Sequence, residues 1–200
     1  NAGGGTPGYQ YSLNGGGNQA NSLFSNLASG NYSIIVTDAN GCTASSNTAL
    51  TDAPGPVINS VTPEDITCNG ANDGEISIGT ASGTAPLQYS INNGASFQGS
   101  SQFTGLAPGT YNIVVSDANG CTATSSVTVN EPAAIQFSTS STPASCGNSD
   151  GTLSISASGG TGALLYSIDN GTTFQASSAF ANLLAGTYNI VVQDANGCQT

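Results

Sequence analysis

The sequence predicts an all-β protein, a tandem array of Ig-like β-sandwich repeats of about 78 residues. One stretch occurs three times, at residues 32–42, 111–121 and 188–198, and each copy runs from a Tyr to Asp-Ala-Asn-Gly-Cys. The copies begin 79 and 77 residues apart. Between them, apolar residues recur with period two in short segments bounded by turn residues, and this pattern is typical of β-strands.

The repeat divides the chain into three parts. Residues 1–53 are a partial repeat whose N-terminal part is missing, residues 54–132 are complete, and residues 133–200 are a repeat whose last strand is cut short. We call these repeats 1, 2 and 3. The period exceeds the roughly 20–50 residues of solenoid turns, so we expect separate small domains. We also expect the chain to be a window on a longer array.

Repeat 2 is expected to contain about seven short strands. Glu75 to Ile78 alternates polar and apolar residues, which places Ile76 and Ile78 inward. The other expected strands lie at 57–62 before Pro63, at 66–68, at 87–91, in one or two short pieces between Phe97 and Phe103, in the central segment that begins at Tyr111, and at 121–129.

Two turn signals bound the later strands. Asn-Gly at 93–94 and again at 119–120 predicts tight hairpins in which both residues take positive φ. Tyr111 follows a Leu-Ala-Pro-Gly-Thr turn. It is either a tyrosine corner, in which the hydroxyl bonds to backbone upstream, or a half-buried core residue.

The segments that join the repeats are short. Residues 51–54 and 130–133 each contain a proline. Proline fixes φ and stiffens a connection, so neighbouring repeats are expected to hold a limited range of angles and to form a semi-rigid rod.

The composition excludes several functions. The chain has no Lys, Arg or His and a net charge of −11. Nucleic acid and anionic membranes are therefore poor partners. The common general bases and Schiff-base nucleophiles are absent, and the acids are scattered over turns, so we expect no enzyme activity. No apolar run reaches the ~20 residues of a membrane-spanning helix, so no membrane insertion is expected.

The five cysteines follow the repeat. Cys68 and Cys146 stand at the fronts of repeats 2 and 3, and Cys121 and Cys198 follow the central strands. The spacing does not fit zinc, and disulfides in an extracellular protein are the natural interpretation. Bonds within a repeat are preferred; a bond from Cys68 to Cys198 across repeats and buried free thiols remain open. The partner of Cys42 is expected outside the chain.

Five aspartates are candidate metal ligands. Asp38, Asp117 and Asp194 open the Asn-Gly reversals, where an Asp side chain commonly accepts hydrogen bonds from backbone N–H groups. The alternative is Ca²⁺ bound at a junction, with Asp73 or Asp150 as further ligands. Calcium takes six to eight oxygens, and the sequence has no dense acidic cluster. No other cofactor is expected.

Several spaced motifs together resemble a known family. They recur in order at residues 68–76, 83–91, 103–111 and 117–121, and they look like the SprB-type repeat of gliding adhesins and other giant surface proteins of Bacteroidota. The resemblance implies a secreted cell-surface adhesin or filament, exported by the type IX system, without catalytic residues. Repeat 3 departs from it at 146–151, which is one residue shorter, and Asn18 stands where Phe97 and Phe174 fill a core position.

The function expected is structural. The chain would serve as the repeat region of a long extracellular surface protein or filament, a semi-rigid stalk. Its partners would be other copies of the same repeat or chain in a fibre. The alternative is a glycan-binding or calcium-stiffened adhesion module that contacts surface glycans or other cells, with the Ser-rich loops 99–101 and 176–178 as the contact.

Overall fold

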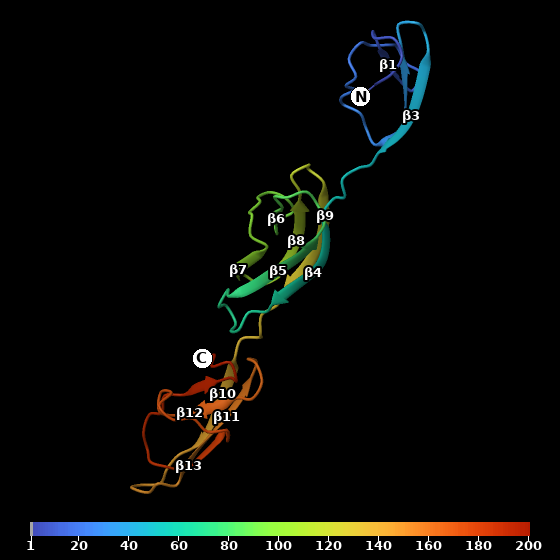
Figure 1. Ribbon diagram of the computed structural model, residues 1–200. Helices are drawn as coiled ribbons and strands as arrows, with labels where there is room; N and C mark the ends of the chain where they lie inside the picture. Colours follow the sequence, from blue (N-terminus) through green and yellow to red (C-terminus); the bar gives the residue numbers. More distant parts are fainter. Residues whose placement is uncertain (1) are drawn as a thin grey trace. The chain divides into compact units, whose positions relative to one another are not determined.

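The computed structural model describes residues 2–200, and they form strands, turns and loops with no helix. None of these residues therefore lies in a helix long and apolar enough to cross a membrane. The chain forms two compact units (Figure 1): one ends at Pro54, and the other, Gly55–Thr200, contains repeats 2 and 3.

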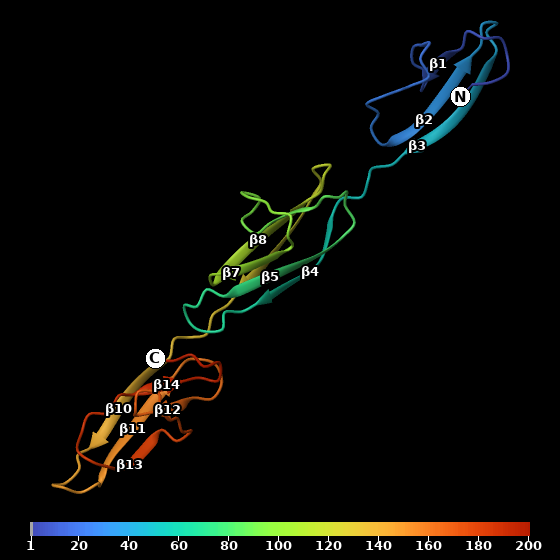
Figure 2. The ribbon, with the colours of Figure 1, turned by 60° about the vertical axis from the view of Figure 1, so that its left-hand side comes forward.

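Repeat 2 is a sandwich of two antiparallel three-stranded sheets (Figure 2), which confirms the predicted fold class. The first sheet has the order β4-β5-β7 and consists of β4 (Val57–Glu64), β5 (Gly74–Ala81) and β7 (Gln102–Leu106). The second has the order β6-β8-β9 and consists of β6 (Gln88–Ser90), β8 (Gly109–Ser116) and β9 (Thr122–Val129).

The core lies between the two sheets. Ile76 and Ile78 of β5 point inward as predicted, and they are 0% and 5% exposed. They meet Ile113 and Val115 of β8, together with Ile66, Tyr89 and Val129. Alternate residues of each strand face this cluster because successive side chains in a strand point to opposite faces. The two sheets are also joined by a hydrogen bond between the hydroxyls of Thr80 and Tyr89, 3.1 Å apart.

The strand count is six, where the sequence suggested about seven. Residues 66–68 form no strand, although Ile66 is buried in the core. Pro63 does not end its strand but lies within β4, paired with Ile76. The strand tolerates this proline because β4 is an edge strand and needs no N–H donor on its outer side.

One of the two Asn-Gly predictions is correct and the other is wrong. Asn93 and Gly94 both have positive φ, as a two-residue hairpin requires. Gly120 has φ of 82°, but Asn119 is not among the residues with positive φ. A three-residue reversal therefore follows Asp117, which closes the turn with its own side chain. Phe97 is also not a core residue, because it is 43% exposed and its ring lies beside Gly94.

The tyrosine corner is present in all three repeats. The hydroxyl of Tyr111 donates to the carbonyl of Ala107, four residues upstream, at 2.8 Å. The Tyr32 and Tyr188 hydroxyls donate to the backbone four residues upstream at 2.6 and 2.9 Å. The alternative of a core tyrosine without this bond is therefore wrong.

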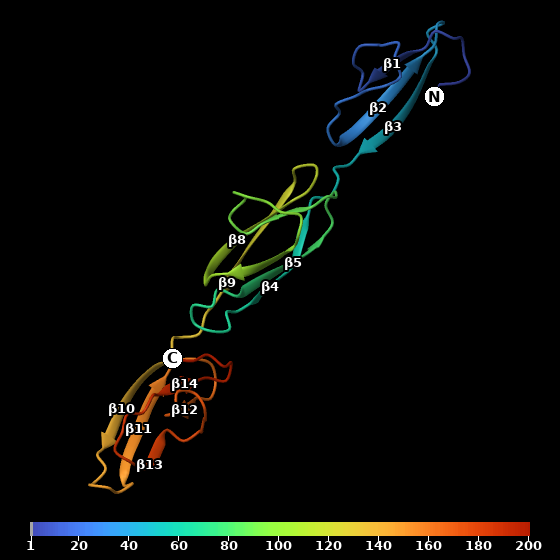
Figure 3. The same cartoon turned by 90° about the vertical axis from the view of Figure 1, so that its left-hand side faces the viewer.

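Repeat 3 follows the same plan (Figure 3). One sheet has the order β10-β11-β13, from β10 (Gln136–Thr142), β11 (Gly151–Ser158) and β13 (Ala179–Leu183), and the other pairs β12 (Leu165–Ser167) with β14 (Val191–Gln193). Leu153, Ile155 and Val192 are buried between them. β14 is shorter than β8, and no strand corresponding to β9 lies beside it in the described chain.

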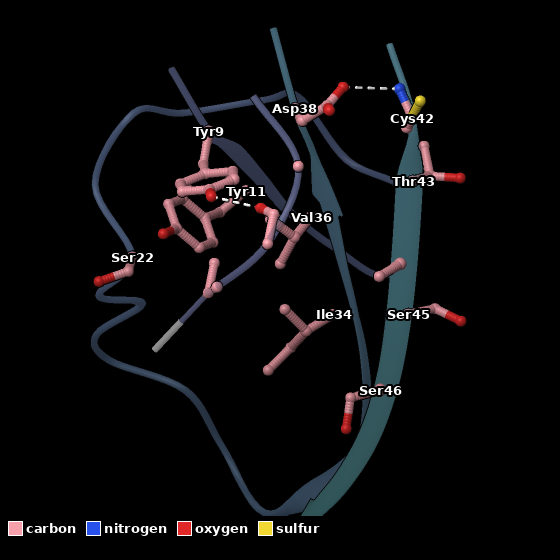
Figure 4. Close-up of a pocket in the computed structure, with 15 residues that line it drawn as sticks. Tyr9, Tyr11, Ser22, Ile34, Val36, Asp38, Cys42, Thr43, Ser45 and Ser46 are labelled. Carbon is pink, nitrogen blue, oxygen red and sulfur yellow. Dashed lines mark hydrogen bonds between the residues drawn. The ribbon is translucent and has the colours of Figure 1, made fainter. Parts of the chain in front are cut away.

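Repeat 1 contains the sheet that corresponds to β6, β8 and β9. Its strands are β1 (Gln10–Leu13), β2 (Gly30–Thr37) and β3 (Thr43–Leu50), in the order β1-β2-β3. Ile34 and Val36, which correspond to the buried Ile113 and Val115, line an open pocket of about 650 Å³ (Figure 4). Residues 23–27 correspond to β7 but form no strand, since the described part of repeat 1 has no β5 equivalent to pair with.

Candidate functional site

Three segments meet where repeat 2 is joined to repeat 3. The first is the front loop of repeat 2, residues 65–73, between β4 and β5. The second is the linker between β9 and β10, residues 130–135. The third is the hairpin Asp194–Cys198 that follows β14. All three lie in the unit Gly55–Thr200, and together they form the junction site.

A disulfide crosses this junction. Cys68 of the front loop is bonded to Cys198 of the hairpin, with their Cα atoms 5.6 Å apart and a sequence separation of 130. The preference for in-repeat bonds is therefore wrong, and the cross-repeat alternative is correct for this pair.

The course of the chain explains this pairing. After β6 the hairpin at Asn93-Gly94 reverses the chain, and Gln98 bridges back to Tyr89 in antiparallel register before β7 begins. Because of this additional chain reversal, β8 runs toward the end of the sandwich where the repeat begins. Cys121, which follows β8, therefore lies at that end. A Cβ atom on Gly55 would lie 3.2 Å from the Cβ of Cys121. Cys68, at the opposite end, meets the next repeat instead.

The other cysteines form no bond within the described chain. Cys42, Cys121 and Cys146 are free and exposed in residues 2–200. The alternative of buried free thiols is wrong for all three, because each of these cysteines is an exposed residue. The expected partner of Cys42 outside the chain stays a prediction.

An asparagine of the hairpin adds a hydrogen bond across the junction. The side-chain amide of Asn196 donates to the carbonyl of Thr67 at 3.0 Å. The same carbonyl lies 3.4 Å from the sulfur of Cys198. This contact is not a hydrogen bond, because a disulfide sulfur carries no proton. The equivalent Asn119 and Asn40 instead donate to threonine hydroxyls within their own repeats, at 2.8 and 2.7 Å.

The linker is held from both sides. Asn130 accepts from Ile66 N–H at 2.9 Å and donates to the Asp65 carboxylate at 2.8 Å. The front loop then donates to the next two linker residues, from the Asn69 amide to the carbonyl of Pro132 and from Gly70 N–H to Glu131, both at 3.0 Å. On the repeat 3 side, Gly160 N–H donates to the carbonyl of Ala133 at 2.8 Å. Few linker torsions are left free.

Asp194 gives the hairpin its shape. It is 3% exposed, and its carboxylate accepts N–H groups of Thr161, Asn196 and Cys198 at 2.7, 3.0 and 2.9 Å. Burial raises the pKa of this carboxyl, but the N–H donors outweigh burial and hold the pKa below its ordinary value. Gly160 must be glycine, because its φ is +67° and a Cβ there would lie 2.9 Å from Asp194.

The other candidate aspartates have the same role. Asp38 and Asp117 accept the equivalent N–H groups in repeats 1 and 2. Asp73 and Asp150 accept from the backbone and hydroxyl of Thr67 and Ser145 in the front loops. These oxygens are thus directed at protein donors. No group of three or more His, Cys, Asp or Glu that could hold a metal gathers within residues 2–200. Calcium binding stays a prediction.

Asp169 was not identified from the sequence as a residue that shapes a turn. Asp169 shapes the Asn170-Gly171 hairpin of repeat 3 and accepts Thr173 N–H at 2.9 Å, the Thr173 hydroxyl at 2.7 Å and the Ser167 hydroxyl at 2.7 Å. These donors, the Thr173 backbone first, lower its pKa from 3.8 to about 2. The signal was the Ser-x-Asp-Asn-Gly order, which in repeat 2 reads Ser-x-Asn-Asn-Gly.

These features define a class of protein: a tandem β-sandwich repeat protein in which repeats 2 and 3 are joined by a short linker and a disulfide. Among known families, the SprB repeat is detected at two places in the chain, residues 60–96 of repeat 2 and residues 138–173 of repeat 3. This family is one of cell-surface proteins. The search of curated proteins found no match. Cys68 and Cys146 lie inside the matched segments, whereas the hairpins 117–121 and 194–198 lie beyond them.

Substitution of Asp169 by Asn should weaken the acid sensitivity of repeat 3. Because the folded pKa is below the unfolded value of roughly 3.9, the carboxylate stabilises the fold above about pH 4 and loses this effect as pH falls toward 2. The melting temperature of Asp169→Asn, measured from pH 5 to pH 2, should fall less than that of the original chain. Asn92→Asp in repeat 2 is the reciprocal control and should fall more. Parallel curves for all three chains would contradict the assignment.

Substitution of Asn196 by Ala should make the Cys68–Cys198 bond easier to reduce. One hydrogen bond contributes about 0.5–1.5 kcal/mol, so the equilibrium constant for bond formation against glutathione should fall roughly 2- to 10-fold. Asn119→Ala is the matched control, because Asn119 bonds within its own repeat and should leave the constant unchanged. An equal effect of both substitutions would show that Asn196 does not act across the junction.

Proposed function

We propose that this chain is the repeat region of a long extracellular bacterial surface protein or filament, and that it acts as a semi-rigid stalk. The observation that carries the proposal is the junction of repeats 2 and 3, where the linker and the Cys68–Cys198 bond provide two covalent connections. A single short linker still allows twist and swing about its free torsions. A second connection away from the linker opposes both.

The disulfide also stabilises the junction against opening. It closes a loop with a sequence separation of 130 residues. In the chain-entropy model, a loop of this size stabilises the folded state by about 5 kcal/mol, which is comparable with the whole stability of a small domain. The hydrogen bonds from Asn196, Asn69 and Gly70 add to this only while the repeats stay docked.

The same bond changes the path that force takes through the chain. Tension applied at the two ends enters repeat 2 through β4, crosses at Cys68 to Cys198, and leaves near Thr200. Residues 69–197, which include five of the six strands of repeat 2, lie in the closed loop and are not extended. A stalk benefits from such a bypass, because its folded repeats keep their length under load.

The composition supports a location outside the cell. A disulfide persists in oxidising environments. The chain has no Lys or Arg, so proteases that cut after basic residues find no site. For the whole protein, the SprB repeat suggests adhesion or gliding and export by the type IX system, with other copies of the repeat in a fibre as partners. Binding of nucleic acid, insertion into a membrane and enzyme activity are not part of this proposal.

A glycan-binding module has less support. The Ser-rich loops 99–101 and 176–178 are tied to their own repeats by glutamine side chains. Gln98 donates to the carbonyls of Ser100, within the loop, and of Gln102, just after it, at 3.0 and 2.9 Å. Gln175 likewise donates to the carbonyls of Ser177 and Ala179 at 2.8 and 3.1 Å. The pocket in repeat 1 is the open core face of β2 and not a platform of projecting side chains. A calcium-stiffened junction is also less well supported, because Asp194 already accepts three N–H groups.

Pulling single chains in an optical trap tests the stalk. With the 200-residue chain held at its ends, full unfolding under oxidising conditions should leave the loop between Cys68 and Cys198 closed. Reduction should then release the loop, whose sequence separation of 130 residues corresponds to about 45 nm of additional contour length. Cys121→Ser is the control and should release the same length. Equal unfolded lengths before and after reduction would contradict the bypass.

A further inference from the structure

We infer that Cys121 and Cys146 are the two halves of the same kind of bond, each directed at another repeat. In this inference Cys146 bonds to the hairpin cysteine of a repeat joined after repeat 3. Cys121 bonds to the front-loop cysteine of the repeat that precedes repeat 2, when that repeat includes its front loop. The partner in each case is a thiol of another SprB repeat. The pairing itself does not depend on the proposed function.

The hairpin of Cys121 has the same geometry as the bonded hairpin of Cys198. Asp117 accepts Asn119 N–H at 3.0 Å and Cys121 N–H at 2.8 Å. Asp194 accepts the corresponding groups at 3.0 and 2.9 Å. In both hairpins the Asp N–H donates to the cysteine carbonyl at 3.0 Å. The backbone of Cys121 is thus held by the same hydrogen bonds as that of the bonded Cys198, and Cys121 is free and exposed.

The front loop of Cys146 is anchored as the loop of Cys68 is. Ser145 N–H donates to Asp150 at 2.7 Å, and Thr67 N–H donates to Asp73 at 3.0 Å, so the residue before each cysteine is fixed to a carboxylate. Both loops lie between the first two strands of their repeats. The loop of repeat 3 is one residue shorter and has Gly147 where repeat 2 has Asn69. The Asn69 contact is therefore absent, but the anchor of the cysteine is retained.

The bond requires an oxidant, which we take to be a disulfide. One thiol is deprotonated and attacks the oxidant, and this mixed disulfide is then attacked by the thiolate of the other cysteine. A new S–S bond joins the two repeats, and the oxidant leaves as two thiols that carry the two electrons and two protons. Oxidised glutathione is sufficient for this balance.

The bonds would overlap along the array. Cys146 lies within the loop that Cys68 and Cys198 close, so the loop that starts at Cys146 begins before the first one ends. In a run of complete repeats each junction would then carry its own bond, and each repeat would lie within at least one closed loop. Reduction of one bond would release one junction and leave the others locked.

An extended chain tests the inference. Cys121 and Cys198 are equivalent, so residues 1–198 can be continued directly with a second copy of residues 122–200, which completes repeat 3 and adds another repeat. The present chain has three free thiols. After refolding with reduced and oxidised glutathione, the extended chain should still show three alkylated thiols, although two cysteines were added. Mass spectrometry should find Cys146 bonded to the second Cys198.

Two outcomes would overturn the inference. One is five alkylated thiols, and the other is a bond between the second Cys146 and the second Cys198 within the added repeat. Cys146→Ser in the extended chain is the control and should raise the number of alkylated thiols from three to four. The Cys68–Cys198 bond is measured in the same digest. If that bond is present and Cys146 is free, the inference fails while the proposed stalk, which rests on Cys68–Cys198 alone, stands.

Discussion

The bond between Cys68 and Cys198 is the constraint on which the account of this protein depends. The bond joins a cysteine at one end of repeat 2 to a cysteine at the facing end of repeat 3. The fold makes this possible because the front loop and the hairpin after the central strand lie at opposite ends of a repeat. The Asp-Ala-Asn-Gly-Cys sequence therefore serves two neighbours. Asp194 folds the turn through the backbone of its own repeat, while Asn196 and Cys198 contact the repeat before it.

Aspartate carboxylates organise several turns of this chain, which has no cationic side chains. With no Lys, Arg or His, an aspartate can be satisfied only by N–H and hydroxyl donors. Asp117, Asp194 and Asp169 each organise a turn in this way, and their pKa values are lowered because the donors favour the ionised form. These aspartates thus fix the backbone conformation of their turns. Folding is expected to be robust at neutral pH and to weaken in acid.

Much of the fold could be predicted from the sequence, because its signals are local. Period-two alternation placed Ile76 and Ile78 in the core, Asn93-Gly94 specified its hairpin, and the turn before Tyr111 indicated a tyrosine corner. The candidate site was less accessible. The turn at Asn119 depends on the side chain of Asp117, and the disulfide depends on the number of chain reversals between β6 and β8, where the bridge at Gln98 is too short to be recognised as a strand.

Disulfide mapping of the oxidised 200-residue chain tests the central claim most directly. A protease that cuts at acidic residues is suitable, because the chain has eleven of them and no basic ones. Under non-reducing conditions, mass spectrometry should find one cross-linked species that joins the peptide of Cys68 to the peptide of Cys198. Species that join Cys68 to Cys121 and Cys146 to Cys198 would contradict the claim, because each repeat would then be closed on itself and the junction would rest on the linker alone.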